Sequence, residues 1–554
     1  MSSVDRIVTD RRRAPVLPAL ASRWFRFVAL FQLGNALAVW SQVVAGQWVL
    51  VETGASAFVV SLVPAAVSLP FVLLALPVGS VVSHRPRESL MAAAMAAAAA
   101  ASVAAALLTA AGLVGPVVLV LVTAVIGVAL VVVGVAWQSM LPETVDRSLI
   151  SSATVLDGAI FNAARALGPV LAGVGLVVLG PTWVFAANGA LFTVAAAAML
   201  VSRRRWPSAV GTREPLWRSM GSGVWFVRHS PWTRRLLFRM FAFGVPAASL
   251  WALLPVVAHD RLELSSVGLG VATGMLGLGA VAGTFFIAPL RDRLSVNVFA
   301  ACGSATYGLV LVVLAVSTSA PLVVVALVPA GVAWVGVQST WMMLANQALP
   351  GWVRPRVVAI MLLVFQGSQA IGAVAWGLLA DAIGTPGALG VAAACLGVTV
   401  NGFRRRGLSG TEGLEPLRIE PQHDLEVADL TGPVQVEQSY EVAESRREAF
   451  VLAARDLRMS RLRMGAQAWV LLVDPLRPGH FIERYRLAEA PELRLMGHER
   501  LTVPEDLVRR RLEELTDSAP PPRLLSVVEL GTPRRTVPRR PARPHDVITP
   551  GGST

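Results

Sequence analysis

The most constraining feature of this chain is a series of about a dozen long apolar runs within its first 403 residues. Each run has roughly 18 residues or more, and a helix rising ~1.5 Å per residue then crosses a hydrocarbon core of ~30 Å. A helix also satisfies its own backbone hydrogen bonds where no water is available. The sequence therefore predicts twelve membrane helices, at residues 27–51, 57–82, 90–111, 116–141, 152–178, 181–201, 236–258, 266–290, 298–316, 321–348, 357–380 and 387–403.

The segments that connect these runs differ in charge, and arginine is concentrated in every second one. The arginine-bearing segments contain Arg11–Arg13 with Arg23 and Arg26, then Arg85 and Arg87, Arg147, the arginines of 202–235, Arg291 and Arg293, Arg354 and Arg356, and Arg404–Arg406. The other segments carry no arginine except Arg261, which Asp260 and Glu263 accompany. Because arginine-rich loops remain in the cytoplasm, we expect a multi-pass protein of the cell inner (plasma) membrane with both termini cytoplasmic.

The composition agrees with a membrane chain and argues against other classes. Hydrophobic residues make up 55% of the 554 positions, and the mean hydropathy is +0.62. The net charge of +13 does not indicate a nucleic-acid partner, because much of the excess lies in membrane-flanking loops and in the tail. Without lysine the chain has no phosphate-binding loop of the ATPase type. Cys302 and Cys395 lie inside apolar runs and give no metal-ligand spacing, so we expect no cofactor and no metal.

An internal repeat divides the apolar region. Phe161-Asn162 corresponds to Phe365-Gln366 at an offset of 204, and residues 166–168 correspond to 370–372 at the same offset. Matching helices in two sets of six predict parallel repeats around a central cavity. We therefore expect an N-terminal half at 1–201, a cytoplasmic loop at 202–235 and a C-terminal half at 236–403. Leu216, Val224 and Phe226 in that loop indicate either an amphipathic helix on the membrane surface or a plain solvated linker.

Hydropathy falls after the twelfth run, where a linker (404–432) leads to a polar region. Its expected elements are a strand at 434–442, a helix at 445–463, strands at 468–474 and 481–487, a helix at about 503–516 and a strand at 524–530. The order β-α-β-β-α-β predicts an α+β ferredoxin-like cytoplasmic domain at 433–530. Residues 531–554 are rich in proline, arginine and glycine, which is typical of a disordered basic tail.

Several motifs resemble the enterobactin-exporter-like branch of the major facilitator superfamily, the transmembrane secretion effectors. They are residues 137–143 (WQSMLPE), 161–169 (FNAARALGP) and 349–357 (LPGWVRPRV), together with Trp40, Gln42 and Trp48 in the first run. Residues 461–469 (RLRMGAQAW) and 497–502 (GHERLT) resemble the soluble appendage of that branch, which is similar to dimeric ferredoxin-like monooxygenases. Pro491 and Arg494 stand near His498 in place of that family's usual Trp and extra His, so we do not expect an enzyme.

The segment after the second run departs from the superfamily pattern. It reads Gly79-Ser-Val-Val-Ser83-His-Arg85-Pro-Arg87, and Ser83 stands where the resemblance implies an acidic gate residue. We expect Gly79, Arg85 and Arg87 to take part in gating without that acid. In the fifth run, Gly168-Pro169 permits close packing and a bend, which makes it a second gating candidate.

Ionisable residues inside the membrane are costly and mark candidate sites. Arg165, near the middle of the fifth run with Asn162 one turn earlier, is a candidate ligand of an anionic substrate, or else bonds nearby helix carbonyls. Asp157 is a candidate proton carrier, or else pairs with a loop arginine near the cytoplasmic interface. Uncharged amides and aromatic residues in the runs can line an amphipathic cavity; the candidates are Trp40, Gln42, Gln338 and Gln366.

These observations predict a secondary transporter that works by alternating access of two six-helix halves. The resemblance implies export of a small organic molecule, such as a siderophore, antibiotic or drug-like compound, coupled to the proton gradient. Three alternatives remain open: a lysophospholipid flippase, a membrane-anchored protein whose C-terminal domain is a monooxygenase-like enzyme or a sensor, or a helical bundle that no longer transports, as Ser83 would then indicate. Expected partners are the small-molecule substrate, the lipid bilayer and a second copy joined through residues 433–530, but no nucleic acid.

Overall fold

The computed structural model describes residues 20, 22–141, 144–146, 149–203, 216–405, 408, 432–488, 492–493, 496 and 502–527. Twelve helices in this part of the chain are long and apolar enough to cross a membrane, which confirms the predicted number. The first six are α2 (Arg23–Glu52), α3 (Ala57–His84), α4 (Arg87–Ala110), α5 (Pro116–Met140), α6 (Ile150–Val178) and α7 (Pro181–Arg203). The last six are α9 (Pro231–Asp260), α10 (Ser266–Arg293), α11 (Val296–Val316), α12 (Ala320–Ala348), α13 (Arg354–Ile383) and α14 (Thr385–Arg405).

Serine residues define the start of several of these helices. Ser56, Ser265 and Ser295 each precede a helix, and each side-chain oxygen accepts a hydrogen bond from the backbone N–H three residues later. Such caps satisfy N–H groups that the start of a helix leaves without a partner. Because these caps stand where loops meet apolar runs, local sequence marks where these three helices begin.

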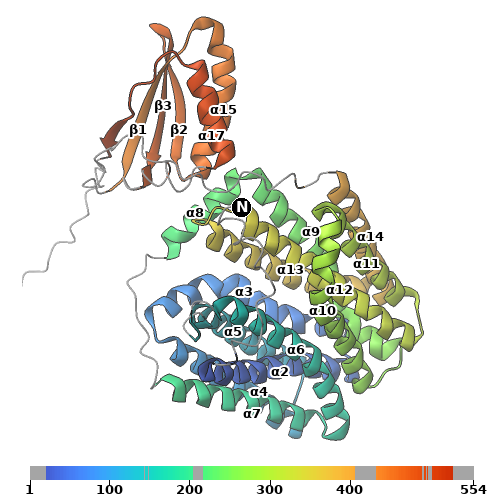
Figure 1. Cartoon of the computed structure of the whole chain (residues 1–554). Coiled ribbons are helices and arrows are strands. Elements are labelled where there is room, and N and C mark those ends of the chain that lie inside the picture. Colours follow the sequence, from blue (N-terminus) through green and yellow to red (C-terminus); the bar gives the residue numbers. More distant parts are fainter. Residues whose placement is uncertain are drawn as a thin grey trace, which may run out of the picture. The chain divides into compact units, whose positions relative to one another are not determined.

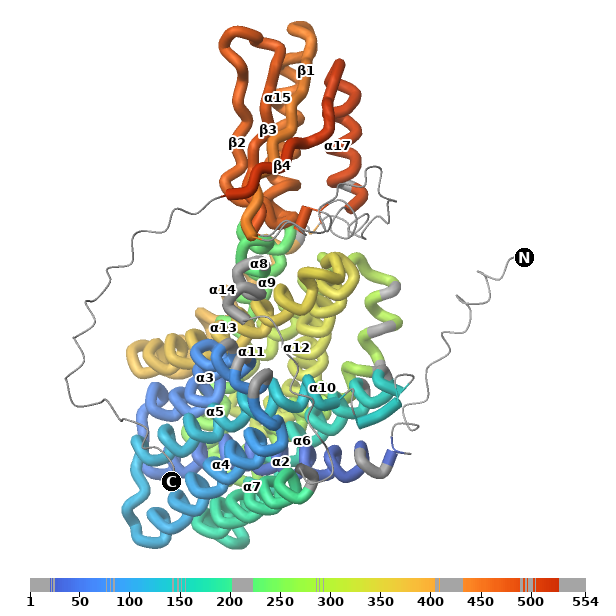
Figure 2. Tube along the Cα trace, turned by 90° about the vertical axis from the view of Figure 1, so that its left-hand side faces the viewer, coloured from blue at the N-terminus to red at the C-terminus, as the bar shows by residue number. Residues whose placement is uncertain are grey.

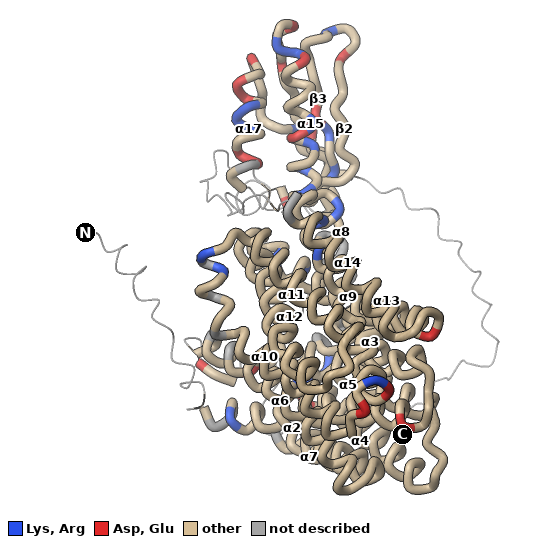
Figure 3. Tube along the Cα trace, turned by 90° about the vertical axis from the view of Figure 1, so that its right-hand side faces the viewer, with Lys and Arg blue, Asp and Glu red and all other residues tan. Residues whose placement is uncertain are grey.

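Apolar side chains cover much of the outside of the helical unit. Leu107, Val117 and Val398 are 66%, 71% and 73% exposed, and Figure 3 shows few charged positions along the helices away from their ends. Apolar surface of this extent is unfavourable in water, whereas lipid tails solvate it and helices leave no backbone group unpaired there. The helical unit is therefore built for a bilayer.

The twelve helices form two groups of six, α2–α7 and α9–α14 (Figures 1 and 2). The groups meet mainly along two helix pairs, α6 with α10 and α3 with α13. Glycines make these contacts possible. A Cβ atom at Gly270 would lie 2.7 Å from the carbonyl oxygen of Pro169, and one at Gly377 would overlap the Ser61 hydroxyl. Small residues let helix backbones approach each other in a membrane, so these two seams join the halves.

The segment between the halves contains a helix, α8 (Leu216–His229). The linker alternative is therefore wrong for these residues. Phe226 is buried, and its ring lies 5.9 Å from that of Trp352 in an edge-to-face arrangement. Gly223 lies against Arg356 at the start of α13. One side of α8 thus packs on protein, because an aromatic anchor is available there.

Most of the described residues after 431 form a second compact unit. Its elements are β1 (Val434–Glu441), the short helix η4 (Glu444–Arg446), α15 (Arg447–Arg463), β2 (Gln467–Asp474), β3 (Arg477–Leu487), α17 (Val503–Leu515) and β4 (Arg523–Ser526). The strands form an antiparallel sheet in the order β2-β3-β1-β4. This order and the two intervening helices confirm the ferredoxin-like prediction. The expected linker and tail, and residues 528–530 of the expected last strand, lie outside the described residues, apart from the ends of the linker.

Both helices of this unit lie on one face of the sheet (Figure 1). Phe450 and Leu457 of α15 are buried with Phe481 of β3 and Leu512 of α17 in one apolar cluster. The helical spacing of Phe450 and Leu457 is what predicted this face. The expected dimerisation through this unit stays a prediction.

A buried acidic residue stands inside the same unit. Glu483 of β3 is 0% exposed and accepts hydrogen bonds from Tyr440 Oη at 2.8 Å, Trp469 Nε1 at 2.8 Å and Arg461 Nε at 3.1 Å. Burial, and then the charge of Glu483, raises the pKa of Tyr440 well above its ordinary value, so the phenol stays a donor. With three donors and one counter-ion, the carboxylate is fully satisfied.

Glu483→Ala is expected to lower the free energy of unfolding of this unit by about 3–5 kcal/mol, because Arg461 would remain buried without its counter-ion. Urea unfolding of residues 430–530, expressed alone and followed by circular dichroism, measures the change. The control Glu514→Ala, at an exposed position of α17, should stay within about 0.5 kcal/mol of the parent. An isolated segment without cooperative unfolding would show that residues 433–530 are not an independent domain.

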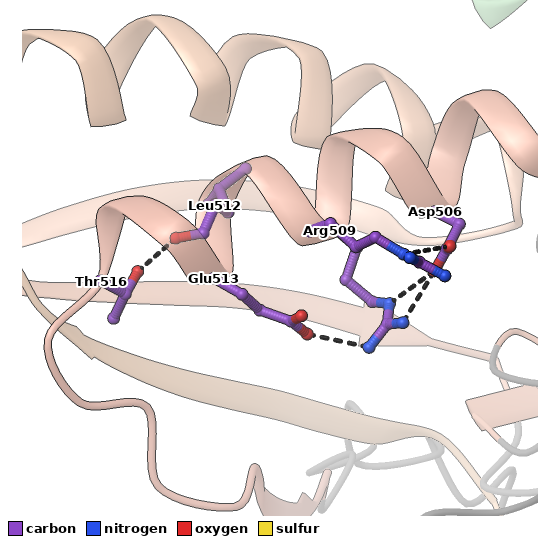
Figure 4. Close-up of polar contacts among 6 residues, drawn as sticks. Asp506, Arg509, Leu512, Glu513 and Thr516 are labelled. Atoms are coloured by element: carbon purple, nitrogen blue, oxygen red, sulfur yellow. Dashed lines mark hydrogen bonds and ion pairs between the residues drawn. The ribbon is translucent and has the colours of Figure 1, made fainter.

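Helix α17 carries a second charged cluster (Figure 4). Asp506 accepts hydrogen bonds from Arg509, at 2.7 and 3.1 Å, and from Arg510 at 2.7 Å, while Arg509 also reaches Glu513 at 2.8 Å. Although burial disfavours its charge, these arginines hold the pKa of Asp506 below its ordinary value. Pairs three and four residues apart stabilise a helix locally, and every member of this cluster has a partner, so it is structural.

Candidate functional site

A cavity of about 1110 Å³ lies between the two halves of the helical unit. Side chains from α2, α3, α5 and α6 line it on one side, and side chains from α9, α12 and α13 line it on the other. Apolar residues form most of the wall, with a few polar groups among them, which is the usual composition of a site for small organic molecules. Among the described residues, no group of His, Cys, Asp or Glu is placed to hold a metal ion.

Arg165 lies in this cavity and is surrounded by tryptophan. Its guanidinium carbon is 4.5 Å from the ring centroid of Trp251, 4.9 Å from that of Trp40 and 5.7 Å from that of Trp334. Together, these three rings and Arg165 form a cluster, the arginine cage. Aromatic faces attract a cation, most strongly those of tryptophan, so the cage compensates part of the cost of placing the charge in the membrane.

The guanidinium forms no hydrogen bond or ion pair with any residue that the structure describes, and its Nε atom is buried without a partner. The expected alternative, bonding to nearby helix carbonyls, is therefore wrong within the described chain. Arg165 comes from α6, Trp40 from α2, and the other two rings from α9 and α12. The cage thus joins residues of both halves.

Asp157 also lines the cavity, two turns before Arg165 on α6. Its carboxylate accepts a hydrogen bond from Trp137 Nε1 of α5 at 2.8 Å. Asn162, between them, donates to the carbonyl of Gly158 at 2.9 Å and lines the cavity as well. No described basic residue pairs with Asp157, while Arg147, the nearest loop arginine in the sequence, lies outside the described residues. The Asp157 carboxyl group therefore lies at the cavity wall, where a molecule in the cavity can contact it.

The predicted amides fall into two groups. Gln338 and Gln366 line the cavity. Gln42 does not: it is 1% exposed, and its side-chain oxygen accepts a hydrogen bond from Asn188 Nδ2 of α7 at 3.0 Å. Its expected contact with substrate is not supported by this position, because the helix turns Gln42 toward α7 and Trp40 toward the cavity.

Sequence reasoning missed Trp251, which contributes the closest ring of the cage. It also missed Gln47, whose side-chain nitrogen donates to the carbonyl of Trp251 at 3.1 Å and so ties α2 to α9. Nothing in an apolar run separates a tryptophan that faces a cavity from one that faces lipid or core. Phe161 and Phe365, by contrast, carried the internal repeat, and both line the cavity.

The gating candidates lie at different depths. Gly79 lines the cavity. Arg87, at the start of α4, donates to the carbonyl of Ser139 at the end of α5 at 3.2 Å, whereas Arg85 is exposed between α3 and α4. Gly168 packs closely on Trp40, and Pro169 lies at the α6–α10 seam. How these residues act in gating stays a prediction.

The cavity extends toward one end of the helices. Its lining residues reach Gly79 and Arg356, at the end where the loops carry arginine, and they stop at Gln47, Arg165 and Ala373 before the opposite end. At that opposite end the halves touch along the α6–α10 and α3–α13 seams, and the backbone N–H of Phe58 donates to Asp381 at 3.3 Å. The cavity is thus closed at one end of the helices and extends to the arginine-bearing end.

Two six-helix halves around a central cavity define a membrane transporter of the major facilitator type. Over residues 14–534 the chain matches the family described as transmembrane secretion effector, and it belongs to that family. This match confirms the resemblance that the motifs at 137–143, 161–169 and 349–357 indicated.

Known relatives and structures agree with this class. The multidrug efflux pump Tap of Mycobacterium tuberculosis (strain ATCC 25618 / H37Rv) is 26% identical over 358 residues, which cover 62% of this chain and 83% of the relative. Tap of Mycolicibacterium fortuitum is 26% identical over 387 residues, which cover 68% of this chain and 92% of the relative.

In fold, the chain is similar to a bacterial homolog of the human lysosomal transporter Spinster in its inward-facing, unoccupied conformation. The TM-score is 0.57 at 13% identity, over 70% of this chain and 96% of that one. The nucleoside transporter NupG gives a TM-score of 0.54 at 11% identity, over 69% and 98%.

Proposed function

We propose that this transporter exports a small organic molecule, of the siderophore, antibiotic or drug-like kind, from the cytoplasm by alternating access and in exchange for protons. The observation that carries the proposal is the cavity between the halves, which reaches the arginine-bearing end and is sealed at the other. The positive-inside rule assigns the arginine-bearing end to the cytoplasm. A substrate would then enter from the cytoplasm in the described state.

Residues that line the cavity are assigned roles on chemical grounds. Arg165, Asn162, Trp40, Gln338 and Gln366 offer charge, hydrogen bonds and ring surface to a substrate. Gln42 supports the wall from behind, through Asn188.

Asp157 is proposed as the proton carrier. It is the one carboxyl group among the described lining residues, and a secondary transporter needs a group that can take up and release a proton on each side. The names of the mycobacterial relatives support export as the direction.

Uptake into inverted membrane vesicles tests the proposal. Vesicles that contain the chain should accumulate hydrophobic drugs or siderophores when an inward-acidic proton gradient is imposed, and should lose them when an ionophore collapses it. Vesicles without the chain provide the control. Absence of accumulation across a broad panel, with the protein shown to be inserted, would contradict export and favour lipid flipping or a role centred on the C-terminal unit.

A further inference from the structure

Three N–H donors of the arginine cage have no acceptor in the part of the chain that the structure describes. Arg165 Nε, Trp40 Nε1 and Trp251 Nε1 are each buried without a hydrogen-bond partner among the residues that the structure describes. Buried donors without partners are rare and costly, and each calls for an explanation. All three belong to residues that line the cavity, so a ligand that enters between the rings can supply the missing acceptor.

The donors are close together and come from both halves. The rings of Trp40 and Trp251 are 6.0 Å apart, and the Arg165 guanidinium carbon lies within 5 Å of both ring centroids, at 4.9 and 4.5 Å. One small chemical group is therefore large enough to reach more than one of the donors after minor side-chain rotation. Because Trp251 belongs to α9 and the other two to α2 and α6, a group bound there would bridge the halves at the point where alternating access must separate or join them.

The charge of the cage limits what this group can be. The cage contains donors and one positive charge, and the lone carboxylate of the described cavity wall, Asp157, is eight residues earlier on α6. At ~1.5 Å per residue that is roughly 12 Å of helix rise, too far for a direct ion pair. Within the described part of the chain, the cage therefore has neither an acceptor nor a counter-ion. A carboxylate or a phenolate supplies both, and its oxygens suit the forked donors of arginine.

The surroundings of the cage favour a planar aromatic body on that anionic group. Trp334 lies 5.6 Å from Phe365, and Trp40 lies 6.1 Å from Phe161, ring centroid to centroid. All four rings line the cavity. Offset stacking and edge-to-face contacts are favourable between aromatic rings at such separations. An organic cation, in contrast, would meet aromatic faces that Arg165 already occupies and would be repelled by its charge.

We infer that the substrates of this transporter are aromatic organic anions, whose acid group binds Arg165 and the indole N–H groups of Trp40 and Trp251. This inference rests on the proposed function, because only a transporter would carry the bound anion across the membrane. The binding site itself can be tested by ligand binding alone.

Binding of three matched probes to the purified full chain in detergent tests the inference. The probes are anthracene carboxylate, its uncharged carboxamide and the cationic anthracene methylammonium, followed by energy transfer from tryptophan. On the parent protein the carboxylate should bind at least about tenfold tighter than the carboxamide, since a charge-assisted bond is about twice as strong as a neutral one, and the cation should bind weakest. In Arg165→Gln the preference for the carboxylate should fall to within about twofold, and partition into micelles cancels in this comparison. Arg234, an exposed arginine near the start of α9, provides a matched control, since Arg234→Gln should leave the preference unchanged.

Equal affinity for carboxylate and carboxamide on the parent protein, or a preference that survives Arg165→Gln, would overturn the inference. If Arg165→Gln does not fold, Trp251→Phe keeps a ring and removes one donor. This variant should lower the preference about threefold, and an unchanged preference would count against the site. Gradient-driven uptake of neutral drugs into vesicles separates the two proposals. Uptake without charge-selective binding would support export and contradict the anion site. Charge-selective binding without uptake would support the anion site and contradict export.

Discussion

Vesicles that contain Asp157→Asn are expected to lose gradient-driven accumulation of substrate, so that the inside-to-outside ratio falls to about 1, while substrate exchange without a gradient continues. An asparagine keeps the shape of the side chain and can still accept the hydrogen bond that Trp137 Nε1 donates at 2.8 Å. It cannot take up or release a proton. The variant therefore removes the proposed proton transfer while it keeps the shape of the cavity wall.

The matched control for this experiment is Asp146→Asn. Asp146 is exposed, shortly before α6 begins, and its loss should leave both accumulation and exchange unchanged. Normal proton-driven accumulation by Asp157→Asn would contradict the assigned role. Coupling would then need another group, because Asp157 is the one carboxyl group among the described residues that line the cavity.

Gly270→Val is expected to reduce transport about 5–150-fold and to open the sealed end of the cavity. A Cβ atom at this position would lie 2.7 Å from the carbonyl oxygen of Pro169, so the α6–α10 seam cannot close without displacing backbone. Overpacking of this kind costs about 1–3 kcal/mol, which shifts a two-state equilibrium by about 5–150-fold. The cost falls on the state in which this end is closed, and the opposite state is relieved of it.

Cysteine labelling detects this shift directly. Val43 lines the cavity, so a Val43→Cys reporter should react with a membrane-impermeant maleimide from the cytoplasmic side in the parent protein. In Gly270→Val the same cysteine should become several-fold more reactive from the other side. Cys302 and Cys395 are exposed and are first replaced by serine. Gly397→Val, at an exposed position with open space around it, is the matched control and should behave as the parent. Unchanged sidedness in Gly270→Val would contradict a seal at this seam.

The prediction of the membrane helices succeeded because each helix depends on properties of its own segment. An apolar run of sufficient length needs no partner in order to be helical in lipid, and the capping serines lie within the same few residues. The ferredoxin-like unit was predictable for a related reason, because the alternation at residues 434–442, which include β1, and the spacing of Phe450 and Leu457 are local patterns. Neither pattern predicts that Glu483 is buried and accepts hydrogen bonds from three side chains.

The candidate site divides differently. Hydropathy and local patterns were enough to predict twelve membrane helices in two halves, to place Arg165 and Asp157 on one helix, and to predict the α+β unit that follows. Three features became visible only in the packed helices: Trp251 completes the cage around Arg165, Gln42 turns toward Asn188 instead of the cavity, and one end of the cavity is sealed. Hydropathy gives the length of a membrane helix but says little about its rotation around its own axis, because lipid and protein interior are similarly apolar. Rotation is set by packing between helices far apart in the sequence, and it decides which side chains meet in the cavity.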